Sequence, residues 1–195
     1  MRRLMRLFYA MLLSMCIALP AQATWYLDNE SSRLSFISTK NLDTSEVHRF
    51  LTLHGTVSDS GKASLRVELE SVSTGVSLRD ERMRAFLFDI EKFPQATVSA
   101  QLDIRPINTL APGAQLELSL PLTLTLHGKS HSYTAELLAT RLDDHRFQVV
   151  TLAPLVLNAA DFDLLKGLDA LREAAGLSAI SRSVPVGAVL IFTQR

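Results

Sequence analysis

The sequence predicts an all-β protein whose antiparallel strands close into a barrel and which also carries two short helical segments. Three observations lead to this prediction. Hydrophobic residues recur at every second position over long stretches, short turns separate these stretches, and two segments break the alternation. Strands with one apolar face must bury it in a two-sheet sandwich or in a barrel. Strands of ten or more residues favour the barrel, because closure also removes exposed strand edges.

The N-terminal residues have the pattern of a secretory signal. Arginines come first, an apolar run follows from Leu7 to Leu19, and Ala-Gln-Ala ends at Ala23. We therefore expect cleavage after Ala23, which divides the chain into a signal peptide, residues 1–23, and one exported domain, residues 24–195. The single cysteine, Cys16, lies in the leader, so we expect a domain without disulfides that depends on a full hydrophobic core.

The charge balance argues against a nucleic-acid-binding protein. The whole chain has 20 basic and 20 acidic residues. The leader contains three arginines and no acidic residue, so 17 basic and 20 acidic residues remain in the expected domain. Because recognition of nucleic acid needs a basic face, we expect no nucleic-acid partner.

The alternation is most regular in residues 114–128, where leucines at even positions share one face and polar residues occupy most of the other. Pro121 lies on the polar face and indicates an edge or a bulge, because proline cannot donate a ladder hydrogen bond. About eight strands would leave an interior that side chains fill or that holds one slender ligand. The other expected strands are 33–39, 47–58, 64–72, 97–105, 130–142, 145–158 and 184–194.

The first helical segment, within residues 78–96, holds the candidate catalytic groups. We expect Ser77 to cap its helix. An acid/base pair could form among its carboxylates; alternatively, Asp80 stabilises the helix start and pairs with a neighbouring arginine. The nearby arginines favour ionised carboxylates, so we interpret the segment as structural and expect no catalytic residue. The candidate acids are Asp80, Glu81 and Asp89, and the arginines are Arg79, Arg82 and Arg84.

The second helical segment covers residues 160–176. Asp161 is expected to cap it and Gly176 to end it. Its apolar residues fall on one helical face. They are Leu164, Leu168, Leu171 and Ala175.

The histidines do not predict a metal site. His127 and His131 are four residues apart, but Gly128 between them indicates a turn rather than one face of a helix. We therefore expect no metal and no cofactor. The aromatic residues before Pro94 allow two interpretations: they are core residues, or they form the apolar lid of a cavity. They are Phe86, Phe88 and Phe93.

Four blocks of the chain occur in an order typical of a known family. They read WYLDNESSRLSF from Trp25, VSTGVSLRDERMRAFLFDIEKFPQATVSA from Val72, LTLTLHGKSHSYTAELLA from Leu122, and a long C-terminal block from Val149. Together they resemble the YceI-like family of periplasmic polyisoprenoid-binding proteins. The second block, with its Arg-Asp, Phe-Asp and Phe-Pro steps, is the most specific.

The resemblance implies an elongated eight-stranded antiparallel β-barrel, lipocalin-like in shape, with an apolar tunnel. It also implies a periplasmic location, a polyisoprenoid or similar long lipid as ligand, often a homodimer, and no catalytic residue. We expect ligand contacts from one strand face and from the phenylalanine cluster. These residues are Phe86, Phe88, Phe93, Leu118, Leu120, Leu122 and Leu124.

Two other functions remain open from the sequence. The protein could be an enzyme that modifies a lipid inside the same tunnel, or an accessory subunit of a quinone-dependent membrane redox system. A carrier of membrane lipids would also make transient membrane contact.

Overall fold

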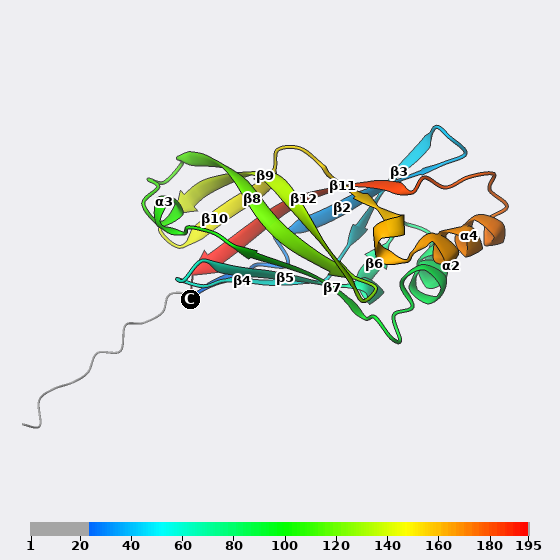
Figure 1. The fold of residues 1–195 in the computed structure, drawn as a ribbon. Coiled ribbons are helices and arrows are strands. Elements are labelled where there is room, and N and C mark those ends of the chain that lie inside the picture. Colours follow the sequence, from blue (N-terminus) through cyan, green and yellow to red (C-terminus); the bar gives the residue numbers. More distant parts are fainter. Residues whose placement is uncertain (1–23, 195) are drawn as a thin grey trace, which may run out of the picture.

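The computed structural model describes residues 24–194, so the expected signal peptide and its cleavage after Ala23 lie outside the described residues. The described chain is an elongated β-barrel with helices at both ends (Figure 1). Its strands are β1 (Trp25–Leu27), β2 (Arg33–Lys40), β3 (Thr44–Phe50), β4 (Leu53–Val57), β5 (Lys62–Glu68), β6 (Val72–Ser73), β7 (Gln95–Gln101), β8 (Gln115–Leu126), β9 (Lys129–Asp143), β10 (Arg146–Thr151), β11 (Leu155–Asn158) and β12 (Ser183–Gln194).

The helical elements are short. They are η1 (Leu69–Ser71), α2 (Ser77–Arg82), the π-helical η2 (Met83–Phe88), α3 (Arg105–Asn108), η3 (Ala159–Phe162) and α4 (Leu165–Ala174). The two expected helical segments are therefore confirmed as α2 with η2 and as η3 with α4. The helix α3 was not among the predicted elements.

Eight strands close the barrel, as the resemblance implied. Their order is β1, β4, β5, β7, β8, β9, β10 and β12, and β12 pairs with β1 to complete the ring. All of these pairings are antiparallel. Each of these eight strands pairs with the next one in this order, and the ring is closed.

Several wall strands bend, which corrects two of the expected boundaries. Residues 47–58 form β3 and β4 with a break at residues 51–52, and residues 145–158 form β10 and β11 with a break at residues 152–154. Both β10 and β11 pair with β12, so the break is a bend within one wall. Strongly curved barrels need such interruptions, and period-two alternation alone does not reveal them.

Side-chain oxygens accept the backbone N–H groups that these bends leave without a strand partner. Thr151 Oγ1 accepts from Ala188 N at 3.1 Å, where β12 passes from β10 to β11. The buried Ser32 accepts from Ile191 N at 2.9 Å beside the β1–β2 bend. Because an unpaired buried N–H is costly, these short polar side chains stabilise the curved wall.

Pro121 lies where one ladder stops. The β8–β9 register runs past Pro121 without a shift, whereas the β7–β8 ladder ends at the Ala100–Leu122 pair. The expected edge is therefore present locally. The predicted strand 97–105 is too long, because β7 ends at Gln101 and the chain turns into α3 at Arg105.

The helix ends correct the two predicted caps. The N-cap of α2 is Val76, and Ser77 is already helical. Asp161 lies inside η3, whose N-cap is Asn158, with a side chain that accepts from Ala160 N. The predicted end at Gly176 is confirmed, because Gly176 has a φ of 63° and follows Ala175, the C-cap residue of α4.

Two hydrophobic clusters lie toward the two ends of the barrel. At the α3 end, Trp25 packs on Phe147 with ring centroids 4.6 Å apart, and Ile104 and Ile107 join the cluster. At the opposite end, α2, η2 and α4 cover the barrel, and the fully buried Phe162 lies in the larger cluster.

Candidate functional site: a cavity inside the barrel

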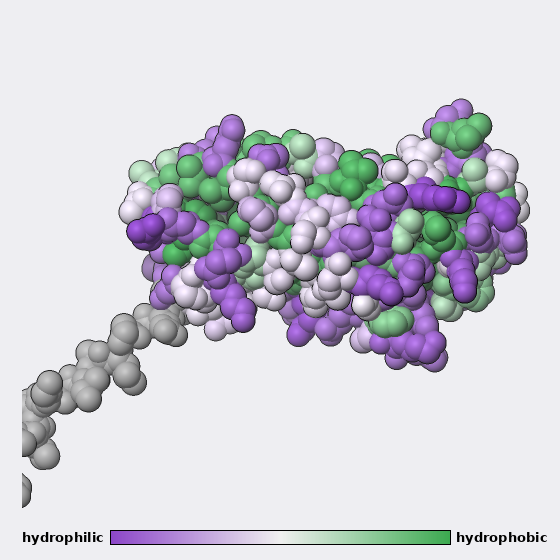
Figure 2. Space-filling model, viewed as in Figure 1, coloured by the Kyte–Doolittle hydropathy of each residue, from purple (hydrophilic) through white to green (hydrophobic). Residues whose placement is uncertain are grey.

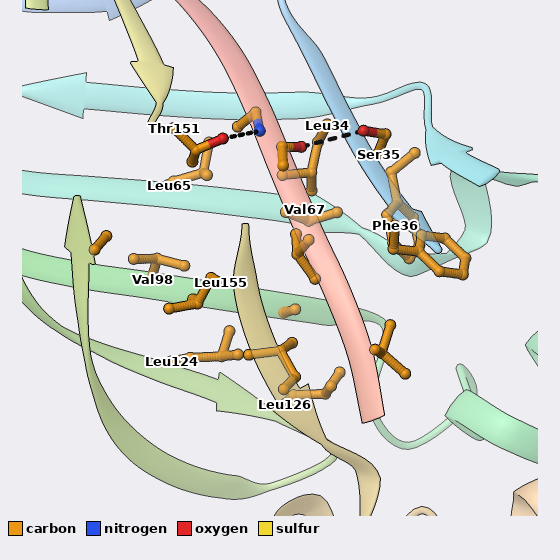
Figure 3. Close-up of a pocket in the computed structure, with 18 of the residues that line it drawn as sticks. Leu34, Ser35, Phe36, Leu65, Val67, Val98, Leu124, Leu126, Thr151 and Leu155 are labelled. Atoms are coloured by element: carbon orange, nitrogen blue, oxygen red, sulfur yellow. Dashed lines mark hydrogen bonds between the residues drawn. The ribbon is translucent and has the colours of Figure 1, made fainter. Parts of the chain in front are cut away.

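The barrel encloses a cavity of about 570 Å³. Its walls come from most of the barrel strands, and its lining is largely aliphatic and aromatic. In Figure 3, Leu65, Val67, Val98 and Leu124 approach the same space from β5, β7 and β8. A hollow of this size with apolar walls is suited to an apolar ligand.

The alternating leucines of β8 form one face of this cavity. Leu118, Leu120 and Leu122 line it but are only partly buried, whereas Leu124 is 7% exposed. The partial exposure of inward-facing leucines arises because they border empty space instead of packed neighbours. The predicted inward face of this strand is confirmed, and it divides into a hollow part and a packed part.

Two hydroxyl groups in the wall form hydrogen bonds with the backbone of β12. Ser35 Oγ donates to Gly187 O at 3.4 Å, and Thr151 Oγ1 accepts from Ala188 N (Figure 3). Both side chains line the cavity. Their hydrogen-bonding capacity is thus partly used within the wall, which reduces the polarity offered to a ligand.

The helices α4 and η2 meet closely at the end of the cavity. A Cβ atom on Gly167 would lie 2.5 Å from Phe86 O and 2.7 Å from Leu87 Cα. Only glycine permits this approach of helix to backbone. Leu168 and Leu171 of α4 then line the cavity together with Met83 and Leu87 of the other helical segment.

The only charged side chains among the described cavity-lining residues gather at this same end. Lys40 and Glu46 come from the β2–β3 hairpin, and Arg79 and Arg82 come from α2. Glu46 Oε2 lies 2.9 Å from Lys40 Nζ and 2.5 Å from Arg79 Nη1. The hydrogen bond from Lys40 and then that from Arg79 hold the pKa of Glu46 below its usual value, against the effect of burial. We call these four residues the charged cluster.

Thr74 fixes Arg79 in this arrangement. The Thr74 hydroxyl donates to Asp80 Oδ1 at 2.6 Å and accepts from Arg79 Nε at 2.8 Å, while Arg79 Nη2 donates to Thr74 O. Asp80 also accepts from Thr74 N at 2.8 Å. The guanidinium is therefore held by three hydrogen bonds, including the one to Glu46, and points to the cavity end in a defined orientation.

His48 lies beside the charged cluster and is 3% exposed. Its Nε2 is 2.8 Å from Ser38 Oγ, while its Nδ1 has no hydrogen-bond partner among the described residues. Burial, followed by the charge of Arg79, lowers the pKa of His48 from its ordinary value. His48 is therefore neutral at neutral pH.

Sequence and structure comparisons identify the family. A model described as a YceI-like domain matches residues 25–192. The chain belongs to the YceI-like family. It is similar to a polyisoprenoid binding domain from Saccharophagus degradans implicated in plant cell wall breakdown. The two are 37% identical, with a TM-score of 0.86 over 88% of this chain and 98% of that one.

A second solved structure supports the fold alone. BcnA of Burkholderia cenocepacia is 17% identical, with a TM-score of 0.67 over 85% of this chain and 98% of the other. No match was found among curated proteins.

The YceI-like barrel places only part of the predicted phenylalanine cluster in the cavity. Phe88 lines the cavity, but Phe86 is 50% exposed and Phe93 packs at a tilt against His127, with ring centroids 4.4 Å apart. The expectation that all three face the cavity is therefore wrong for Phe86 and Phe93. Phe86 lies two positions before Phe88 in η2 and so on a different helical face, whereas Phe93 follows the tight turn at Asp89, which has a φ of 46° and redirects the chain. Ligand contact by Phe88 and by the β8 leucines stays a prediction.

The candidate acids do not line the cavity of the YceI-like barrel. Asp80 bonds to Thr74, and Asp89 Oδ2 pairs with Lys92 Nζ at 2.7 Å. The expected partner of Asp80 is wrong in detail, because Arg79 pairs with Glu46 instead. Both interactions are consistent with a structural role for the segment.

The histidines in the β8–β9 turn have structural contacts. His127 Nδ1 is 3.1 Å from Phe162 O, and the His131 ring lies against Phe162. Within residues 24–194, the structure has no group of three or more His, Cys, Asp or Glu residues placed to hold a metal ion. No helix among these residues is long and apolar enough to cross a membrane.

Sequence reasoning missed the charged cluster, although a signal was present. The inward face of β2 runs from Leu34 and Phe36 to Ser38 and Lys40, so it changes from apolar to polar at its end. In the β2–β3 register, Ser38 lies opposite Glu46, so both strands become polar together. A polar change on an inward strand face predicts the end of an apolar cavity.

Proposed function

We propose that this YceI-like protein binds a polyisoprenoid or a similarly long apolar lipid inside the barrel and acts as its carrier in the periplasm. The apolar cavity of about 570 Å³ is the observation that carries the proposal. The description of the Saccharophagus degradans domain as polyisoprenoid binding supports the same class of ligand.

The energetics of such a site favour a long chain. Burial of one methylene group contributes about 0.8 kcal/mol, so one five-carbon isoprene unit contributes roughly 3 to 4 kcal/mol before costs. A few units offset the entropy lost on association without any polar anchor. The β8 leucines, at every second position, provide a continuous apolar wall for such a chain.

Organic extraction of the purified protein, followed by mass spectrometry, tests the proposal. We expect about one unmodified long-chain lipid per folded chain. The chain has one tryptophan, Trp25, and it lines the cavity. Readdition of the lipid to extracted protein should therefore change the emission of Trp25. Recovery of chemically altered lipid after incubation would instead favour the enzyme alternative.

A further inference from the structure

The cavity has two different ends, and this difference gives a bound molecule a direction. At the α3 end the lining consists of apolar residues such as Trp25, Ile107 and Phe147. At the α2 end it contains all four members of the charged cluster. An amphiphilic lipid therefore has its lowest free energy with its tail toward α3 and its head toward α2.

The charged cluster carries more positive than negative charge. Lys40, Arg79 and Arg82 supply three cations, and Glu46 supplies one carboxylate. The carboxylate of the adjacent Asp80 is already directed to the N–H and hydroxyl of Thr74. Glu46 holds Lys40 and Arg79 next to each other. With the carboxylate of Asp80 also counted, the three cations exceed the two neighbouring carboxylates by one positive charge.

These cations are partly withdrawn from water. The side chains of Lys40 and Arg79 are 24% and 29% exposed. Arg82 Nη1 donates to Ala174 O at 2.9 Å, which attaches the guanidinium to the C-terminal end of α4 and leaves its other N–H groups available. Partial burial strengthens the attraction of such groups for an anion.

Figure 2 shows many hydrophilic residues on this end of the molecule, over α2 and α4. We propose that Lys40, Arg79 and Arg82 form a head-group subsite that takes the anionic head, a phosphate or a carboxylate, of the lipid held in the cavity. The inference rests on the proposed function, since it assigns the orientation and head-group class of the same ligand. A container for a wholly neutral lipid would gain nothing from excess positive charge at one end of its cavity.

Three ligands that share one tail and differ only in the head group test the assignment. Geranylgeranyl phosphate, geranylgeranoic acid and geranylgeraniol are titrated into delipidated protein, with Trp25 emission as the readout. We expect the phosphate to bind about tenfold more tightly than the alcohol at low salt, with the carboxylate between them. Raising the salt concentration should reduce the difference. Equal affinities for all three would overturn the head-group subsite and leave lipid binding intact; no binding of any would remove the proposed function itself.

Substitutions that remove a positive or a negative charge distinguish an effect of charge on binding from damage to the fold. Lys40→Gln with Arg82→Gln should reduce the preference for phosphate to about twofold or less and leave geranylgeraniol affinity within about twofold. Glu46→Gln should increase the preference several-fold, because it removes the one negative charge. Lys40→Gln alone loses only the contact with Glu46. It should also reduce the preference for phosphate, and it replaces the double variant if that variant does not fold.

Lys62→Gln is the matched control, because Lys62 is exposed at the other end of the barrel and does not line the cavity. It should keep the preference of the parent. Inorganic phosphate at the concentration of the lipid should not displace geranylgeranyl phosphate, because the tail supplies most of the affinity. An unchanged preference in the double variant would overturn the assignment.

Discussion

The α3 end and the α2 end of the barrel solve the same problem, closure of an apolar interior, in different ways. At the α3 end, aromatic rings pack directly, and the Arg141 guanidinium lies 4.7 Å from the Phe147 ring centroid. At the α2 end, helices pack through backbone contact at Gly167, and charged side chains reach the cavity. The packed end is therefore expected to contribute stability, whereas the proposed head-group subsite lies at the helical end.

The largest expected effect comes from opening the packed end. Trp25→Ala removes a side chain that is 3% exposed and should lower the free energy of unfolding by about 3 to 5 kcal/mol. Urea denaturation of delipidated protein measures this loss. Tyr26→Ala, next in sequence but 40% exposed, is the control and should cost far less. Equal losses for the two variants would contradict a packed plug at this end.

A smaller effect is expected where the two helical segments meet. Gly167→Ala places a methyl group against Phe86 O and Leu87 Cα, so the helices must separate, at a cost of about 1 to 3 kcal/mol. The separation should also speed lipid release, measured by transfer to acceptor vesicles. Lys166→Ala, at the neighbouring exposed position, should leave both properties unchanged. Slower release from the Gly167 variant would argue against these helices as the entrance.

The wall between the ends provides a third contrast. Leu53→Ala, at a position 1% exposed, should cost about 2 to 5 kcal/mol through the cavity that it leaves. Leu120→Ala removes a leucine that already borders empty space, so delipidated protein should lose only about 1 kcal/mol. Recovered lipid per folded chain should nevertheless fall in the Leu120 variant. Similar losses of stability at both positions, with full lipid content, would mean that the interior is packed.

The smallest expected effect depends on pH and is confined to the helical end. The pKa of His48 is lowered in the folded state, so the unfolded state binds the proton more readily. Its contribution to stability is complete above the ordinary value of 6.5 and declines as the pH falls below it. Thermal denaturation across this range should show a smaller decline for His48→Gln. An identical pH profile in the parent and the variant would remove His48 as the cause.

The fold could be predicted from the sequence because alternation is a local property. The leucines of β8 and the motif blocks around Arg79 and Phe93 indicate the barrel and the family without knowledge of distant contacts. The bends could not be predicted in the same way. They depend on which N–H group on β12 meets Thr151 or Ser32, more than 30 residues away in sequence.

The candidate site was predicted unevenly for the same reason. Strand periodicity places Leu118 to Leu124 on the inward face, but it does not orient a side chain in a helical segment. Phe88 faces the cavity and Phe86 does not, because residues two positions apart in a helix lie on different faces. The pairing of Glu46 with Arg79 joins positions 33 residues apart and had no local signal.

The pairing of β12 with β1 has a consequence for how the molecule folds. The strand that completes the ring comes after every other wall strand in the sequence, and it joins the one that comes first. Until that final pairing forms, no inner surface is enclosed, and the rows of leucines meant for the cavity remain available to other chains. Folding dominated by such distant pairings takes milliseconds to seconds. Intermediates with open edges and exposed leucines are prone to aggregate, so during that interval the nascent barrel depends on shielding by something other than its own wall.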